Sequence, residues 1–121
     1  MPKVNIELLA ATTPEARVQI SDAVHDAMVQ TLGTAGAGRF HLFTEVSPAH
    51  QSSHPDARPR GANPVFLTFY LAPRPHDVIT SMIRAVVGRL EEKAGFAREE
   101  VGIIVVDVPS NQWFWEGKDL G

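Results

Sequence analysis

The sequence predicts an α+β fold in which one β-α-β unit occurs twice along the chain. An alternating apolar segment, an amphipathic helix and a second apolar segment follow one another in the first half, and the same order recurs in the second half. A glycine, Gly33 or Gly95, follows each predicted helix. Because two strands joined by a helical crossover are parallel and right-handed, two such units predict a four-stranded sheet with two helices on one face.

The first unit begins with a strand and continues into a helix. Val4, Ile6 and Leu8 alternate with polar residues, which is the strand period. Residues 12–15 carry signals for the start of a helix. Thr12 lies three residues before Glu15, which fits a capping box, and Pro14 suits the first turn. Whether Thr12 or Thr13 is the capping residue stays open. Apolar residues at four-residue spacing give the helix one buried face: Ile20, Val24, Met28 and Leu32. Gly33 can end the helix in the left-handed conformation, and a second strand is predicted over 40–46.

The second unit repeats this order after a polar link. We expect a strand over 65–71, a helix opened by Pro75 and ended by Gly95, and an aliphatic strand over 101–108. The apolar face of this helix comprises Ile79, Met82, Ile83, Val86, Val87 and Leu90. A near-continuous aliphatic strand is typical of one buried on both faces or lying at a parallel edge.

The two halves align without a gap when the chain is shifted along itself so that Pro2 meets Pro64 and Gly33 meets Gly95. The prediction is a single domain, 1–121, with the following parts: pseudo-repeats 2–46 and 64–108, a polar linker 47–63 and a C-terminal tail 109–121. Helices on one face leave the other sheet face bare. Because that face carries apolar residues, we expect other subunits to bury it.

Composition excludes several classes of function. The chain has 121 residues, 44% of them hydrophobic and 21% charged, which suits one ordinary globular domain. A net charge of −3 argues against nucleic-acid or anionic-membrane partners. There is no cysteine, which excludes disulfides, thiol catalysis and thiolate metal sites. No apolar run approaches the roughly 20 residues of a membrane span, and no signal peptide is recognisable, so a cytoplasmic location is expected.

The N-terminal sequence Met1-Pro2 carries the most specific functional signal. Initiator methionine is normally removed before a residue as small as proline, which would leave Pro2 with a free secondary amine at the start of a strand. An amine held beside apolar surface is a candidate acid, base or nucleophile. The alternative is an ordinary solvated terminus.

Four short segments carry a resemblance to a known family. They are Ala27-Met28-Val29 with Leu32-Gly33, Gly38-Arg39-Phe40, Pro73-Arg74-Pro75 and Gln112-Trp113-Phe114-Trp115-Glu116-Gly117. Together with the N-terminal proline and the duplicated unit, they resemble the tautomerase superfamily. The chain looks most like the long-subunit branch that includes malonate semialdehyde decarboxylase. The resemblance covers nearly the whole chain and implies a homotrimer.

The chain departs from the decarboxylase pattern at two places. Gly38 stands where the decarboxylase has an aspartate, and Ala72 with Arg74 stands where it has two arginines. Relatives that hydrate or decarboxylate their substrates rely on those polar groups. The departures therefore favour a tautomerase over a decarboxylase or hydratase.

Chemistry assigns roles to the candidate residues. Pro2 would be the acid/base, and a nearby Arg74 would both lower the pKa of that amine and hold a substrate anion. An apolar wall would exclude water. Its members are Trp113, Trp115 and, depending on the geometry of the tail, Phe114. Arg58 and Arg60 of the linker are either solvated or substitutes for the missing arginine, whereas an ion pair is the expected role of Arg39.

The sequence thus predicts a cofactor-independent keto–enol tautomerase of a small, carboxylate-bearing keto or enol compound. It predicts no metal, no cofactor, no nucleic-acid or membrane partner, and self-association as a homotrimer. Two alternatives stay open. One is a decarboxylase or hydratase of a 3-oxo acid such as malonate semialdehyde, and the other is a non-catalytic trimeric scaffold or ligand binder. Sequence does not fix whether Pro2 is protonated at neutral pH.

Overall fold

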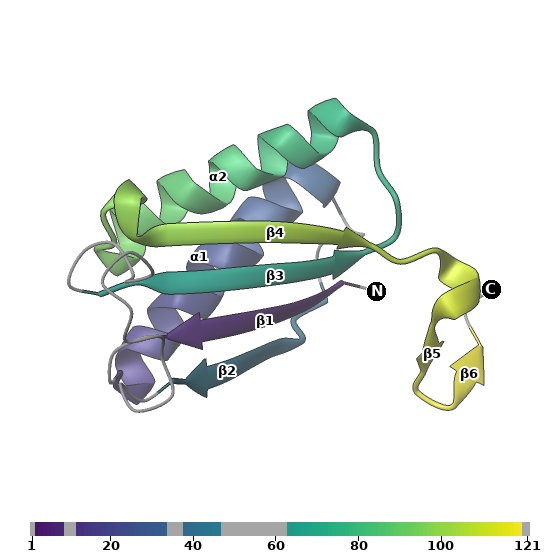
Figure 1. Cartoon of the computed structure of the whole chain (residues 1–121), viewed down its shortest axis with the longest axis horizontal. Helices are drawn as coiled ribbons and strands as arrows, with labels where there is room; N and C mark the ends of the chain where they lie inside the picture. Colours follow the sequence, from purple (N-terminus) through teal and green to yellow (C-terminus); the bar gives the residue numbers. More distant parts are fainter. Residues whose placement is uncertain (1, 9–11, 34–37, 47–62, 120–121) are drawn as a thin grey trace, which may run out of the picture.

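The computed structural model describes residues 2–8, 12–33, 38–46 and 63–119 (Figure 1). The main elements are β1 (Lys3–Leu8), α1 (Pro14–Leu32), β2 (His41–Glu45), β3 (Val65–Leu71), α2 (His76–Ala94) and β4 (Val101–Asp107). Shorter elements in the second half are the 3₁₀ turns η4 (Arg98–Glu100) and η5 (Ser110–Gln112) and the strands β5 (Phe114–Trp115) and β6 (Lys118–Asp119). Among the residues that the structure describes, no helix is long and apolar enough to cross a membrane.

The four long strands form one mixed sheet in the order β2-β1-β3-β4. Within each β-α-β unit the two strands are parallel, and the two units meet through the antiparallel pair β1–β3. Both helices cover the same face of this sheet (Figure 1). The predicted α+β fold, with two helices on one face of a four-stranded sheet, is confirmed.

Helix α1 begins at a side-chain cap. The Oγ1 of Thr13 accepts a hydrogen bond of 3.1 Å from the backbone N–H of Ala16, so Thr13, not Thr12, is the capping residue. At the other end, Gly33 has φ 62° and ψ −143°. The positive φ requires glycine, but the ψ places the residue outside the left-handed helical region that the sequence led us to expect.

Helix α2 begins without a side-chain cap. The carbonyl of Pro75 accepts the backbone N–H groups of Val78 and Ile79, both at 3.1 Å. The helix ends at Gly95, which has φ 74° and ψ 18°. This is the left-handed cap predicted for the second unit.

A single apolar core fills the space between the sheet and the two helices. The side chains that line it alternate along β1 and β3 and recur every four residues along α1 and α2. Its fully buried members include Ile6, Leu8, Ile20, Val24, Met28, Leu67, Phe69, Met82, Val86 and Leu90. Because both units contribute to one core, neither helix has a separate apolar layer of its own.

Strand pairing corrects the gapless alignment of the two units. That alignment holds for the helices and for the second strands, where β2 residue His41 meets β4 residue Ile103. However, His41 pairs with Val4 whereas Ile103 pairs with Leu67, so Val4 corresponds to Leu67 and not to the preceding residue, Phe66. The residue equivalent to Pro2 is accordingly the one after Pro64. The connection after β1 is therefore longer by a single residue than the connection after β3.

The sheet face opposite the helices is apolar in β2, β3 and β4. Leu42, Phe66 and Val106 are exposed there, and Ile104 leaves 50% of its surface accessible. The strand pairs β1–β3 also place the Nζ of Lys3 over the ring of Tyr70, 5.4 Å from its centroid. The predicted bare face is thus present in the single chain.

The C-terminal tail forms a small hairpin beyond the end of the sheet at which β1 begins (Figure 1). Strands β5 and β6 are antiparallel, with Trp115 opposite Lys118. The two residues between them, Glu116 and Gly117, have φ values of 52° and 80°. Positive φ at both positions is typical of the type I′ turn, which matches the twist of a two-residue hairpin.

Candidate active site

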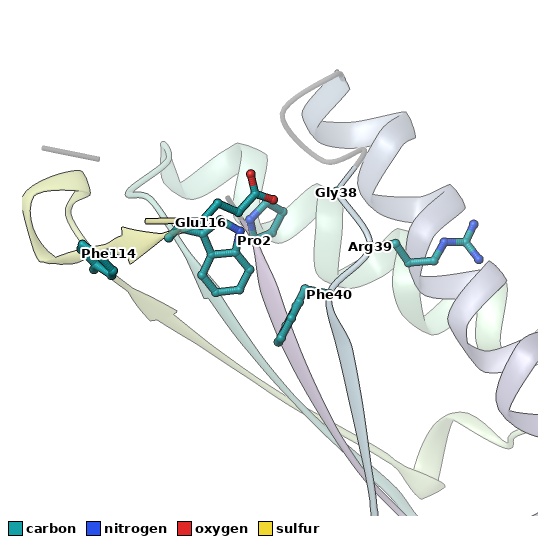
Figure 2. A pocket seen from close by; sticks show the side chains of 7 residues that line it. Pro2, Gly38, Arg39, Phe40, Phe114 and Glu116 are labelled. Atoms are coloured by element: carbon teal, nitrogen blue, oxygen red, sulfur yellow. The ribbon is translucent and has the colours of Figure 1, made fainter. Parts of the chain in front are cut away.

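An open pocket of about 600 Å³ lies where the start of β1, the segment before β2 and the tail hairpin come together (Figure 2). It is lined by Pro2, Gly38, Arg39, Phe40, Phe114, Trp115 and Glu116. These residues come from both ends of the sequence and from the middle. The fold thus brings three of the residues predicted for the site, Pro2, Phe114 and Trp115, into one pocket.

Pro2 is buried and immediately precedes the first residue of β1. The backbone N–H of Val4 donates to the carbonyl of Phe40 at 3.0 Å, which ties the start of β1 to the segment before β2. Sheet pairing at Val4 therefore fixes the position of Pro2. A free amine at Pro2 stays a prediction.

Aromatic rings form one wall of the pocket. Phe40 meets Trp115 edge-to-face, with ring centroids 4.8 Å apart and planes at 77°. Trp113 meets Trp115 in the same manner at 6.1 Å, and its Nε1 donates to the carbonyl of Val108 at 2.9 Å. Trp113 therefore packs against Trp115 but does not itself line the pocket. Phe114 lines the pocket and is largely exposed.

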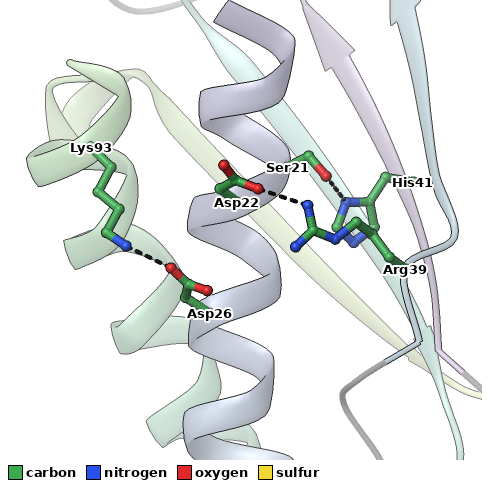
Figure 3. A network of polar contacts seen from close by, with 6 residues as sticks. All are labelled: Ser21, Asp22, Asp26, Arg39, His41 and Lys93. Carbon is green, nitrogen blue, oxygen red and sulfur yellow. Dashed lines mark hydrogen bonds and ion pairs between the residues drawn. The ribbon is translucent and has the colours of Figure 1, made fainter.

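Arg39 lines the pocket but directs its guanidinium away from it, toward α1 (Figure 2). There its Nη1 bonds the Oδ1 of Asp22 at 2.7 Å (Figure 3). The ion pair expected for Arg39 is confirmed. Its charge is thus engaged on the outer surface of α1 and does not face Pro2.

Sequence reasoning did not assign Phe40 or Glu116 to the site. Phe40 was placed only at the start of a strand, and Glu116 only in the aromatic tail. The signal that could have found Glu116 was the dipeptide Glu116-Gly117, because glycine after a polar residue is typical of a tight hairpin turn that would fold the tail back.

Arg74 lines a different pocket. That pocket has a volume of about 330 Å³ and is also lined by His76, Ile79, Val105 and Asp107. The antiparallel pairing of Lys3 with Tyr70 places the end of β3 beside the start of β1, so Arg74 and Pro2 lie at the same end of the sheet. The structure does not bring them into one pocket of the single chain. Arg58 and Arg60 lie outside the described residues.

A histidine lies behind the segment that carries Arg39. The Oγ of Ser21 and the Nδ1 of His41 are hydrogen-bonded at 2.8 Å (Figure 3). Burial is the main reason that the pKa of His41 is lowered from 6.5 to about 4, and the charges of Arg39 and His25 contribute in smaller measure. His41 is therefore neutral at physiological pH, its Nδ1 contacts Ser21 of α1, and it does not line the pocket.

The two helices are also joined on their exposed side. The Nζ of Lys93 in α2 donates to the Oδ2 of Asp26 in α1 at 2.5 Å (Figure 3). This hydrogen bond is the main reason that the pKa of Asp26 lies below its usual value. Neither residue lines the Pro2 pocket, and the pair links the two helices.

Family comparison agrees with the fold. A family model described as tautomerase enzyme matches residues 38–114, and a second model with the same description matches residues 2–55. The first of these ranges covers more than half of the chain. The protein therefore belongs to the tautomerase superfamily. A search of curated proteins gave no match.

Solved structures of this superfamily share the fold. A malonate semialdehyde decarboxylase has 21% identity, with 93% of this chain and 89% of that chain covered and a TM-score of 0.81. A fused 4-OT described as a symmetric trimer also has 21% identity, with coverage of 97% and 94% and a TM-score of 0.79. At this level of identity the likeness shows the architecture alone.

Proposed function

We propose that the protein is a cofactor-independent keto–enol tautomerase that uses Pro2 as its acid/base. The observation that carries the proposal is the placement of Pro2, which is buried at the start of β1 and lines an aromatic pocket. Membership of the tautomerase superfamily supports an enzyme of this kind. The metal-free and cofactor-free character follows from the reaction, which needs only proton transfers.

The reaction moves a proton between a carbon beside a carbonyl and the carbonyl oxygen. A base takes the proton from one position and an acid supplies one at the other. Pro2 provides the nitrogen once Met1 is removed. The rings of Phe40 and Trp115 give the same pocket an apolar wall, which would strengthen electrostatic effects on the developing enolate.

The proposed substrate is a small keto or enol compound that carries a carboxylate. Arg74 is the proposed anion-binding residue, because it lines a pocket at the same end of the sheet as Pro2. Arg58 and Arg60 remain proposed contributors to substrate binding. An Arg74→Gln variant should raise KM for a carboxylate substrate more than it lowers kcat.

We also propose a homotrimer in which the bare sheet faces of three chains pack together. The exposed apolar side chains of β2, β3 and β4 support this assembly, as do superfamily structures described as trimers. Light scattering should give about three times the chain mass of 13.2 kDa. Ile104→Glu should abolish the trimer, whereas Val18→Glu, at an exposed position on α1, should leave it intact. A monomeric wild type would contradict the proposal.

The test of function compares the mature wild type with two proline variants. Turnover of phenylenolpyruvate and 2-hydroxymuconate should fall by at least about 100-fold in Pro2→Ala, since a positioned acid/base contributes about that much. Pro64→Ala is the matched control, because Pro64 also precedes a strand but does not line the pocket, and it should retain activity. Intact mass should show that Met1 is absent. Retained Met1, or full activity in Pro2→Ala, would contradict the proposal.

A decarboxylase of a 3-oxo acid is the second candidate. Glu116 favours it, because this carboxylate supplies the pocket with an acidic group although position 38 is a glycine. Release of carbon dioxide from malonate semialdehyde, with no turnover of the two enols, would favour this alternative. Absence of all three activities, together with retained Met1, would favour a non-catalytic ligand binder.

A further inference from the structure

The tail hairpin brings a carboxylate into the Pro2 pocket. Glu116 occupies the first position of the turn between β5 and β6 and lines the pocket together with Pro2. Figure 2 shows its side chain extending from the hairpin toward Pro2. The edge-to-face contact of the preceding residue, Trp115, with Phe40 fixes the hairpin against the segment before β2. The carboxylate is therefore held at the pocket by packing and does not hang from a free tail.

Glu116 occupies a backbone conformation that glutamate adopts rarely. Among the described residues, it is the one non-glycine residue with positive φ, at 52°. Asparagine, aspartate or glycine would suit this position of the turn better. Turn formation alone therefore gives no reason for a glutamate here, whereas a longer side chain that reaches the pocket does.

The charge of Glu116 is not used elsewhere in the described parts of the chain. The neighbouring cation on the pocket rim, Arg39, is bonded to Asp22 and points away. Within residues 2–8, 12–33, 38–46 and 63–119, Glu116 makes no hydrogen bond or ion pair. Among these residues, the solvent-exposed carboxylate of Glu116 and the candidate amine of Pro2 thus line one pocket, and no other described residue is bonded to the carboxylate.

We propose that Glu116 is the second proton-transfer residue of the site, exchanging a proton with the substrate oxygen while Pro2 exchanges one with the substrate carbon. This inference rests on the proposed function. A single group that served both positions would have to move its proton across the substrate within one turnover. Two groups on different elements can act at the two positions without that movement.

The step balances in protons and electrons. In ketonisation, the protonated Pro2 nitrogen gives its proton to the enol carbon, and the electron pair of the C=C bond forms the new C–H bond. The Glu116 carboxylate accepts the proton of the enol O–H, and the O–H pair becomes the second bond of the carbonyl. The products are the ketone, a neutral Pro2 amine and a protonated Glu116. Exchange with water returns both groups to their starting states, and nothing is oxidised or reduced.

The proposal predicts a bell-shaped dependence of ketonisation on pH. Activity requires an ionised Glu116 and a protonated Pro2 together, so the acidic limb reports the carboxylate and the alkaline limb reports the amine. Removal of the carboxylate should therefore lower the rate and also abolish the acidic limb. A residue with a purely structural role would lower the rate without changing the limb.

The experiment measures kcat and its pH profile for three Glu116 variants of the mature protein. Glu116→Gln should lower kcat for phenylenolpyruvate by about 100-fold and remove the acidic limb. Glu116→Asn should lose activity similarly while its melting temperature stays equal or rises, because asparagine suits the turn. Glu116→Asp should retain more activity than Glu116→Gln. Glu92→Gln, at an exposed position on α2, is the control and should match the wild type.

Three results would overturn the inference. One is a Glu116→Gln variant with kcat within about threefold of the wild type. Another is a variant that loses activity but keeps the acidic limb. In both cases a large loss in Pro2→Ala would leave the proposed function standing. The third is absence of enol turnover in the wild type, which would overturn the proposed function and this inference together.

Discussion

The two β-α-β units differ in the backbone contacts made near the start of their first strands. In the second unit, Glu100 accepts the backbone N–H of Asn63 through Oε2 at 2.6 Å and that of Ala97 through Oε1 at 2.9 Å. When the two helices and the strands after them are aligned, the equivalent position of the first unit is Gly38, which lines the pocket beside Pro2. In the second unit, a carboxylate therefore bonds the backbone before the first strand, and we call this the closed end. In the first unit, the equivalent position has no side chain and borders the pocket, and we call this the open end.

This difference shows how a duplicated fold can separate stability from a site. Both units have the same helix and the same parallel strand pairing. The core is therefore built in the same way whether or not a carboxylate bonds the backbone before the first strand. The open end then receives its acidic group from outside the repeat, through Glu116 of the tail hairpin. The equivalent positions 38 and 100 therefore differ in function: Glu100 bonds two backbone N–H groups, whereas Gly38 lines the pocket.

The largest expected effect tests whether the two units share one core equally. Ile6 and Phe69 occupy equivalent positions on the central strands, and both are completely buried. Ile6→Ala should lower the free energy of unfolding by about 2–5 kcal/mol and Phe69→Ala by about 3–5 kcal/mol. Urea unfolding measures both. A loss below about 1 kcal/mol in either variant would mean that the units do not contribute equally.

The next effect concerns His41, whose equivalent in the second unit is Ile103. The pKa of folded His41 is about 4, against 6.5 as the usual value, so the unfolded chain binds a proton between these pH values that the folded chain does not. Stability should therefore be lost as pH falls from about 6.5 to 4, by about 2 kcal/mol after allowance for solvent screening. His41→Ile copies the second unit and should flatten this part of the curve. An unchanged slope in thermal unfolding would contradict the assignment.

A smaller effect is expected when the closed end is copied onto the open one. Gly38→Glu introduces the side chain of Glu100 at the equivalent position and should occupy part of the pocket. We expect kcat/KM to fall about tenfold, equivalent to about 1.4 kcal/mol, with little change in melting temperature. Gly88→Ala on α2 is the control, because a Cβ there meets no atom within 4 Å. Wild-type kinetics in Gly38→Glu would show that position 38 does not limit the pocket.

The smallest effect is the converse change. Glu100→Gln removes the charge that accepts two backbone N–H groups and should cost about 1 kcal/mol, as the loss of a helix cap does. Activity should not change, since Glu100 does not line the Pro2 pocket. Glu99→Gln, at the exposed neighbouring position, should leave the midpoint of urea unfolding unchanged. Equal stability of the two variants would remove the role assigned to Glu100.

Local pattern was sufficient to predict the elements but not their exact correspondence. Strand β3 spans Val65–Leu71 as predicted, because a run of apolar and aromatic residues flanked by prolines is a local signal. The gapless alignment placed Val4, which faces the core, on Phe66, which faces away from it. A register error of a single position reverses the face of a strand, and the extra residue between β1 and α1 could not be recognised by matching glycines and helix faces alone.

The pocket was predictable only in part for a related reason. Pro2 and the aromatic tail carry distinctive residues, so chemistry could single them out before any contact was known. The participation of Phe40 and Glu116 depends on where the tail hairpin packs, and that is decided by the contact of Trp115 with Phe40, which lies in the other half of the sequence. Local periodicity gives no information about a contact between residues so far apart in the sequence. For the same reason it could not predict that Arg74 lines a different pocket.

The hairpin also sets the order in which the pocket can form during synthesis. Pro2 leaves the ribosome long before Phe114, Trp115 and Glu116 do. A nascent chain that ends after β4 already contains the buried core residues that the structure describes, but it lacks one wall of the pocket. The catalytic amine of our proposal would therefore stay exposed to water and to other reactants in the cell until the tail hairpin has been synthesised and packs beside it.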